Sequence, residues 1–223
     1  NEKAFQSRLI DKETYSVNKS IALYEISMIK KQSALQDSIN LIEKALKLRQ
    51  YFPPYVCHYA ELLIENNNFL KAKKYLYKSW NHFPHPDYRL VIKLLSTRMK
   101  VPYFQLADYI TSSTKSLPQS KILMAESFID NQKWIEAKNQ LTSLLEHKPS
   151  KEVCLLMSII EAGDSNDPQK INAWVSRSNF GELNHVWICR FSNISEEKWT
   201  SVSKAGHFNS LVWKKPESLT ELP

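Results

Sequence analysis

Glycine is scarce in this chain of 223 residues, where only Gly163, Gly181 and Gly206 occur. Loops that cradle phosphates and turns that bind dinucleotides need several closely spaced glycines, because only glycine adopts the required backbone conformations freely. The three glycines here lie far apart, so no such loop can be built from them. The sequence therefore disfavours a nucleotide-binding enzyme.

Cysteine is equally scarce, and Cys57, Cys154 and Cys189 lie far apart. An odd number at this spacing predicts neither a disulfide framework nor a CxxC metal pair, and it fits a reducing compartment. Cys57 and Cys154 lie in apolar helical stretches, where cysteine usually serves as a small core residue. No HExxH or GxSxG motif occurs either. We therefore expect no enzyme, no catalytic residue, no metal site and no cofactor.

Long apolar runs are also missing, since the longest, VCLLMSII, is far shorter than the roughly 20 residues that span a bilayer. The first residue is Asn1, and the first helix is expected almost at once. We expect from this that the chain is a fragment whose natural N-terminus has been removed, in which case any anchor or signal upstream would lie outside this sequence.

Basic residues exceed acidic ones, giving a formal charge of +7. Such a charge favours an acidic partner, an anionic membrane surface or nucleic acid. Lysines that only solvate exposed helix faces are the alternative. The clearest cluster falls on the polar side of one expected helix and lacks the arginines typical of phosphate recognition: Lys71, Lys73, Lys74 and Lys78.

The segment from Pro53 to Pro86 reads as one helical hairpin, with helices over about 54–65 and 69–82 and a polar turn between them. It matches the tetratricopeptide pattern, whose period is near 34 residues. In that pattern small residues stand where the two helices approach closely, and Ala60 and Ala72 take these positions. Phe69 at the start of the second helix, Leu76 one turn after Ala72 and Pro84 at the end of the unit match the pattern as well.

The same register recurs along the chain. A shift of 34 residues maps Phe69 onto Tyr103 and Pro84 onto Pro118, but it replaces Ala72 by Leu106, so the third unit is degenerate. A first unit is expected over 17–31 and 34–48, and a fifth over 151–163 with a partner helix after Asp167. The fourth unit is regular and contains Ala125, Trp134, Ala137, Leu141 and Pro149.

About five hairpins in this register predict an all-α fold, a right-handed superhelix over residues 1–180. Each hairpin cannot bury its own apolar face, so neighbours stack and leave a concave surface for a protein partner. The recurrent aromatics Phe69, Tyr103 and Trp134 are expected to fill the space between hairpins.

The character of the sequence changes over residues 181–223. HVWIC and HFNSLVW are typical of short strands, and this small module is dense in aromatic residues. A module of this size cannot hold itself together by burial alone, so it either binds a metal or packs its aromatics on the last hairpin. Its aromatic framework is Trp187, Trp199, Phe208 and Trp213.

Several stretches resemble the C-terminal part of the HemY-like family of membrane-anchored bacterial tetratricopeptide proteins, alphaproteobacterial type. They are SWNHFPHPD, KWIEAKNQLTSLLEHKPSKEVCLLMSIIE and the tail WICRFSN…KWTSV…GHFNSLVWKKP. The resemblance implies a zinc-ribbon tail, but here only Cys189 remains of the first knuckle, with Ser192 as its mate. We therefore expect a ribbon-like β-hairpin module without metal. The resemblance also implies a bacterial inner-membrane protein of which this chain is the soluble part, and the family's name links it to haem biosynthesis. The basic charge suits a domain at the cytoplasmic face of the membrane, near anionic lipid.

These features predict a non-enzymatic scaffold that binds protein partners on its concave surface. A nucleic-acid-binding module, using the basic surface and the aromatic tail, is the alternative. A haem or tetrapyrrole carrier is a third possibility, although no Cys-Pro or CxxCH motif is present.

Overall fold

The computed structural model describes residues 2–146 and 148–216. The chain divides into two compact units, Asn1–Leu123 and Met124–Pro223, which we call the first and second unit. The helices that begin in the first unit are α1 (Glu2–Gln6), α2 (Lys12–Lys30), α3 (Leu35–Leu48), α4 (Pro53–Glu65), α5 (Phe69–His82), α6 (Tyr88–Met99), α7 (Tyr103–Thr111) and α8 (Pro118–Asp130).

The second unit combines helices with a small sheet. Its further elements are α9 (Trp134–Leu141), a short 3₁₀ turn (Thr142–Leu144), α10 (Lys151–Asp164), α11 (Pro168–Ser178), β1 (Val186–Cys189), β2 (Ser195–Glu196) and β3 (Leu211–Lys214). The division between the units falls inside α8. The boundary predicted at 180/181 marks a different feature, the change from helices to strands, and it stays a prediction.

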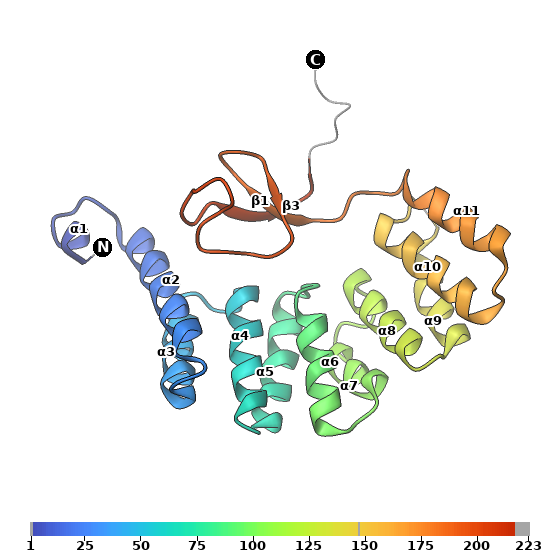
Figure 1. Ribbon diagram of the computed structural model, residues 1–223, viewed down its shortest axis with the longest axis horizontal. Coiled ribbons are helices and arrows are strands. Elements are labelled where there is room, and N and C mark those ends of the chain that lie inside the picture. Colours follow the sequence, from blue (N-terminus) through green and yellow to red (C-terminus); the bar gives the residue numbers. More distant parts are fainter. Residues whose placement is uncertain (1, 147, 217–223) are drawn as a thin grey trace, which may run out of the picture. The chain divides into compact units, whose positions relative to one another are not determined.

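The helices follow the predicted hairpins of tetratricopeptide type, and Figure 1 shows them side by side in the order of the sequence within the first unit. The second hairpin, predicted over 54–65 and 69–82, is α4 and α5. The pairs α2–α3, α6–α7, α8–α9 and α10–α11 take the places of the other four. The right-handed superhelical winding stays a prediction.

The turns inside four hairpins share one backbone conformation. One residue of each turn is left-handed: Asn67 (φ 55°), Lys100 (φ 55°), Gln132 (φ 55°) and Asn166 (φ 49°). Helices often end in this conformation, and glycine or asparagine adopts it most easily. The chain repeats the turn without any glycine, so its scarcity in glycine is compatible with a regular repeat.

The small positions predicted from the repeat lie in the core. Ala60, Ala72, Ala125 and Ala137 are fully buried. Leu76 and Leu141 are also fully buried, Pro149 is buried, and Pro84 is half-buried. Small side chains let packed helices approach closely, which explains why alanine recurs there.

The repeat aromatics differ in burial. Tyr103 is buried, whereas Phe69 and Trp134 are half-buried. Trp134 at the start of α9 lies directly against Gly163 of α10, in the space that a β-carbon on Gly163 would occupy. The absence of a side chain at Gly163 therefore makes room for the indole ring.

We expect the Gly163→Ala substitution to destabilise the protein by about 1 kcal/mol. An alanine at an open helical position would stabilise by about 1 kcal/mol, but overpacking a filled site costs about 1–3 kcal/mol. Urea unfolding of the single variant measures the loss. When Trp134 is replaced by leucine, the Gly163→Ala substitution is expected to stabilise the protein relative to the Trp134→Leu variant alone. If Gly163→Ala alone stabilised the protein, the result would contradict the packing of Trp134 against Gly163.

The C-terminal module contains a three-stranded antiparallel sheet in the order β2-β1-β3. In its register Trp187 pairs with Trp213, and their ring centroids are 5.2 Å apart. β1 lies within the stretch predicted for it, and β3 overlaps its predicted stretch but ends one residue beyond it, at Lys214; β2 was not predicted. Trp187 and Trp199 are buried, Trp213 is half-buried, and Phe208 is 51% exposed.

Hydrogen bonds to a buried carboxylate organise the same module. Glu196 is only 6% exposed, and it accepts the backbone N–H of Lys204 at 2.7 Å and the hydroxyl of Thr200 at 3.2 Å. A buried carboxylate needs such donors to offset its lost hydration. Through these hydrogen bonds Glu196 fixes the loop that follows β2.

Candidate functional site

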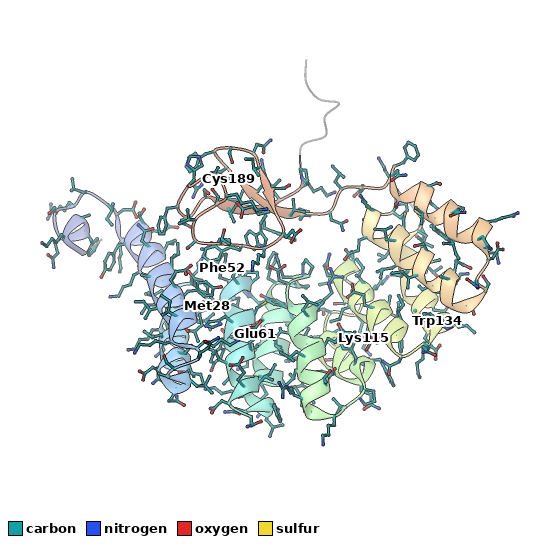
Figure 2. The ribbon with its side chains drawn as sticks, in the orientation of Figure 1. Met28, Phe52, Glu61, Lys115, Trp134 and Cys189 are labelled. Atoms are coloured by element: carbon teal, nitrogen blue, oxygen red, sulfur yellow. The ribbon has the colours of Figure 1, made fainter. Side chains whose placement is uncertain are left out.

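The first helices of the first three hairpins, α2, α4 and α6, form one continuous surface in the first unit. Each of the three helices has a small buried residue, namely Ser27, Ala60 and Ser96. The residues three positions before these, Tyr24, Cys57 and Lys93, form one row. Met28, Glu61 and Thr97 form a second row, one turn further along each helix, and Figure 2 labels Met28 and Glu61. We call these two rows the first-helix face.

An ion-pair cluster joins α2 to α4 beside this face. The Nζ atom of Lys31 lies 2.7 Å from Glu65 Oε1 and 3.4 Å from Glu61 Oε2. Partial burial alone would lower the pKa of Lys31, but the hydrogen bond with Glu65 and the charge of Glu61 raise it. A lysine shared by two carboxylates leaves net negative charge here, next to which a partner could place a cation.

Cys57 connects the face to the next hairpin. Its Sγ donates to the backbone carbonyl of Asp87, just before α6, at 3.4 Å. Burial and the nearby charge of Asp87 raise the pKa of this thiol well above its ordinary value. A neutral thiol is a poor nucleophile, so Cys57 is a structural residue.

His58 joins α2, α3 and α4 from beneath the face. Its Nε2 lies 2.9 Å from Ser27 Oγ, and the hydroxyls of Ser27 and Ser38 each donate to the other's backbone carbonyl, at 2.8 and 2.7 Å. The Ser27 oxygen can only accept from His58, so Nε2 carries the proton. Nδ1 is buried and has no hydrogen-bond partner. This neutral cluster fixes the register of α2, α3 and α4.

Apolar side chains remain exposed on these helices. Met28 is 44% exposed, and Leu90 and Leu94, one turn apart on α6, are 80% and 38% exposed. Methionine suits surfaces that adapt to a bound chain, and exposed apolar groups stabilise a complex when a partner covers them. The face thus combines apolar contacts with an anionic cluster, which suits the binding of a polypeptide.

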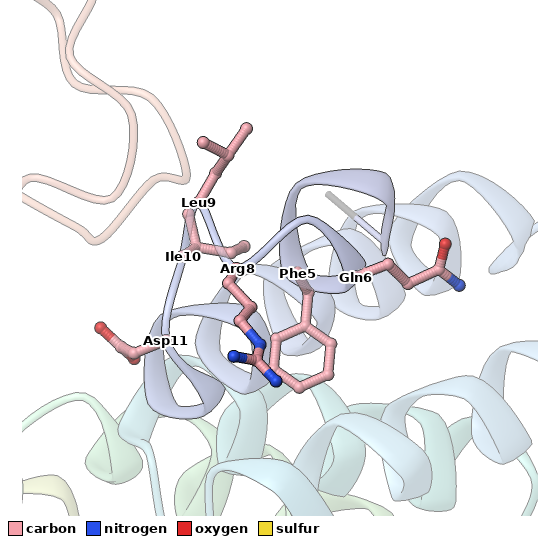
Figure 3. Close-up of a pocket in the computed structure, with 6 residues that line it drawn as sticks. All are labelled: Phe5, Gln6, Arg8, Leu9, Ile10 and Asp11. Atoms are coloured by element: carbon pink, nitrogen blue, oxygen red, sulfur yellow. The ribbon is translucent and has the colours of Figure 1, made fainter.

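A separate depression of about 570 Å³ lies around the segment after α1. All its lining residues come from positions 5–11, and Figure 3 shows Phe5 beside Arg8 while Leu9 and Asp11 point in other directions. Polar groups that converge on one point are typical of a ligand site, and they are missing here. We assign no function to this depression.

The structure does not support a zinc ribbon. Among residues 2–146 and 148–216, no group of three or more His, Cys, Asp or Glu side chains could hold a metal ion. The buried thiol of Cys189 donates to Ser210 Oγ at 3.3 Å, and Ser210 donates to the carbonyl of His207 at 3.0 Å. The sulfur therefore belongs to a chain of hydrogen bonds inside the sheet, and Ser192 is only half-buried.

Of the residues predicted from the repeat, Ala60 lies beneath the candidate site rather than on it. Ala60 is fully buried behind the face that carries Glu61 and Cys57. Sequence reasoning missed the face residues because tetratricopeptide patterns mark core positions. One signal is local to α4: Glu61 directly follows the small position Ala60 and so falls on a less buried side of the helix.

No family model and no curated protein matches the chain. Among solved structures it is similar to YrrB, described as a TPR protein with an unusual peptide-binding site, at 10% identity and a TM-score of 0.38, over 75% of this chain and 91% of that chain. It is also similar to a MamA RS-1 ArsTM double mutant, at 9% identity and a TM-score of 0.37, over 73% of this chain and 93% of that chain.

Proposed function

We propose that the chain is a non-enzymatic scaffold that binds a polypeptide partner on the first-helix face. One observation carries the proposal: the face spans three hairpins and combines exposed Met28 with the Lys31–Glu61–Glu65 cluster, and Leu90 is exposed on the same helix as Thr97. A partner that covers this surface gains from apolar burial, at about 25 cal/mol per Å² before the costs of association. The charged cluster adds specificity.

The distribution of charge argues against the nucleic-acid alternative. Residues 181–223 contain five lysines and arginines and five aspartates and glutamates, so the aromatic module has no net charge. Nucleic-acid binding needs a basic surface at the site of contact. The basic excess of the chain lies instead in its first 123 residues, where nineteen basic residues face ten acidic ones, a net of +9.

We also propose that the chain is the soluble part of a HemY-like protein anchored in a bacterial inner membrane, with the domain facing the cytoplasm and a link to haem biosynthesis. The resemblance of the C-terminal stretches supports this. No helix in the described part of the chain is long and apolar enough to cross a membrane. Fractionation of cells that contain the natural full-length protein tests for the anchor. An anchored protein is expected in the inner-membrane fraction, and recovery in the soluble fraction would contradict the anchor.

Site-specific photo-crosslinking in the source cells tests the scaffold. A photoreactive residue at Met28 or Thr97 is expected to capture a defined partner. Ser112, which is exposed beyond the end of α7, provides the control position. Equal capture of many proteins from all three positions would contradict a binding surface on the first helices. Added hemin is expected to give no ligated Soret band, which separates the scaffold from a haem carrier.

A further inference from the structure

A groove of about 260 Å³ lies on the other side of the first unit, between the second helices α3 and α5. Tyr59 of α4 is buried, and its ring is nearly perpendicular to the ring of Tyr75, with the ring centroids 4.9 Å apart. The ring of Tyr51 lies at a tilt against the ring of His82, with the centroids 4.3 Å apart. We call this the tyrosine groove. Its lining residues are Leu46, Lys47, Gln50, Tyr51, Tyr59 and Tyr75, with Glu43 at one end.

The single carboxylate of the groove has its charge compensated. Glu43 Oε1 accepts the phenol of Tyr59 at 2.6 Å and the ammonium of Lys71 at 2.8 Å. Partial burial would raise the pKa of Glu43, but the hydrogen bonds from Lys71 and Tyr59 lower it. Burial is the largest cause that raises the pKa of Tyr59, and the hydrogen bond to Glu43 is the second. Together they raise this pKa to about 12, so the phenol stays neutral. The groove therefore presents neutral rings and no free anion.

The rim of the groove is basic. Lys47 lines it on α3, and on α5 Lys78 shares a helix face with Tyr75, three residues away. Both lysines are exposed, and α5 contains four lysines and no acidic residue. The excess of nineteen basic over ten acidic residues in positions 1–123 strengthens this positive field.

The size and the backbone of the groove indicate a peptide side chain as its occupant. Small-molecule sites usually enclose about 300–1,000 Å³, which is more than this groove offers. Tyr51 is also left-handed (φ 52°), a conformation that is uncommon for an aromatic residue and costs on the order of 1 kcal/mol or more. This conformation holds the Tyr51 ring at the groove and against His82.

We propose that the tyrosine groove is a second docking site, which takes an acidic peptide segment of a partner protein. One aliphatic or aromatic side chain of the segment enters between Tyr51, Tyr59 and Tyr75. The flanking carboxylates lie beside Lys47 and Lys78. Charge complementarity selects this occupant, because a basic or neutral segment would gain nothing from the rim. The groove lies apart from the first-helix face, so each site can be tested without the other.

Fluorescence anisotropy with the whole chain tests the proposal. The probe is a short labelled peptide of glutamate and serine residues around one leucine. We expect saturable binding that weakens as salt rises from about 0.1 M to about 1 M, since screening shortens the range of charge interactions. Replacing the leucine by serine, or the glutamates by lysines, is expected to abolish binding. Equal binding of the serine peptide, or displacement by a single-stranded oligonucleotide, would overturn the proposal.

Two variants and a control separate docking from stability. Lys47→Glu is expected to weaken binding about tenfold, whereas Lys44→Glu, the same change on the same helix outside the groove lining, is expected to weaken it less than about twofold. Tyr51→Asn removes the ring but suits the left-handed backbone, so binding should be lost while thermal stability is kept. Unchanged affinity in Lys47→Glu and Tyr51→Asn would contradict the site, whatever crosslinking finds on the first-helix face.

Discussion

Replacing Trp80 by alanine is expected to lower the free energy of unfolding by about 3–5 kcal/mol, the range for removing a large aromatic side chain from a core. Trp80 of α5 is fully buried, and its Nε1 donates to Ser120 Oγ, at the start of α8, at 2.9 Å. Its ring also lies 6.3 Å from that of Tyr88 on α6. One side chain thus joins three consecutive hairpins, so its loss should affect them together.

Chemical denaturation of purified variants measures this effect. Trp80→Phe keeps most of the apolar volume and loses the hydrogen bond, so a smaller loss of about 1–2 kcal/mol is expected. Leu90→Ala provides the surface control, because Leu90 is 80% exposed and its truncation should change stability by less than about 0.5 kcal/mol. A loss below about 1 kcal/mol for Trp80→Ala would show that the hairpins do not depend on this contact.

The second large effect is a loss of stability in mild acid through His58. Burial, and to a lesser extent the charge of Lys31, lowers the pKa of His58 from 6.5 to about 4. The unfolded chain therefore binds the proton first as the pH falls below 6.5, and stability decreases until the pH approaches 4. Between pH 7 and pH 5 the loss from this group is on the order of 2 kcal/mol.

The matched comparison uses His58→Leu, which removes the titrating group and keeps an apolar side chain in the core. The difference in unfolding free energy between wild type and variant should shrink by about 2 kcal/mol from pH 7 to pH 5. Carboxylates shared by both proteins cancel in this difference. A difference in unfolding free energy that does not change with pH would mean that folding does not lower the pKa of His58.

The hairpins could be predicted because their sequence signals are local. Ala60 and Ala72 mark a close approach of two helices at fixed spacing, and the structure buries both completely. Asp167 before Pro168 predicted a helix start, and the Asp167 carboxylate accepts the backbone N–H of Gln169 at 2.9 Å. Such signals depend on neighbours along the chain, so a single sequence is enough to find them.

The candidate sites could not be predicted, because they depend on contacts between distant residues. Glu43 and Lys71 belong to different hairpins, and only the packing of α3 beside α5 makes their ion pair and the tyrosine groove. The left-handed backbone of Tyr51 carries no sequence signal either, since glycine or asparagine would be expected there. Likewise, nothing in the run of residues around Glu196 indicates a buried carboxylate.

Binding of the crosslinked partner to a double variant, Met28→Asp with Thr97→Asp, tests the first-helix face most directly. Both side chains are exposed, so the variant should fold, and unchanged thermal unfolding confirms this. The account predicts at least about a tenfold loss of affinity by isothermal titration calorimetry, because two charges would be placed within a contact that excludes water. Unchanged affinity in a folded double variant would contradict the first-helix face as the binding surface.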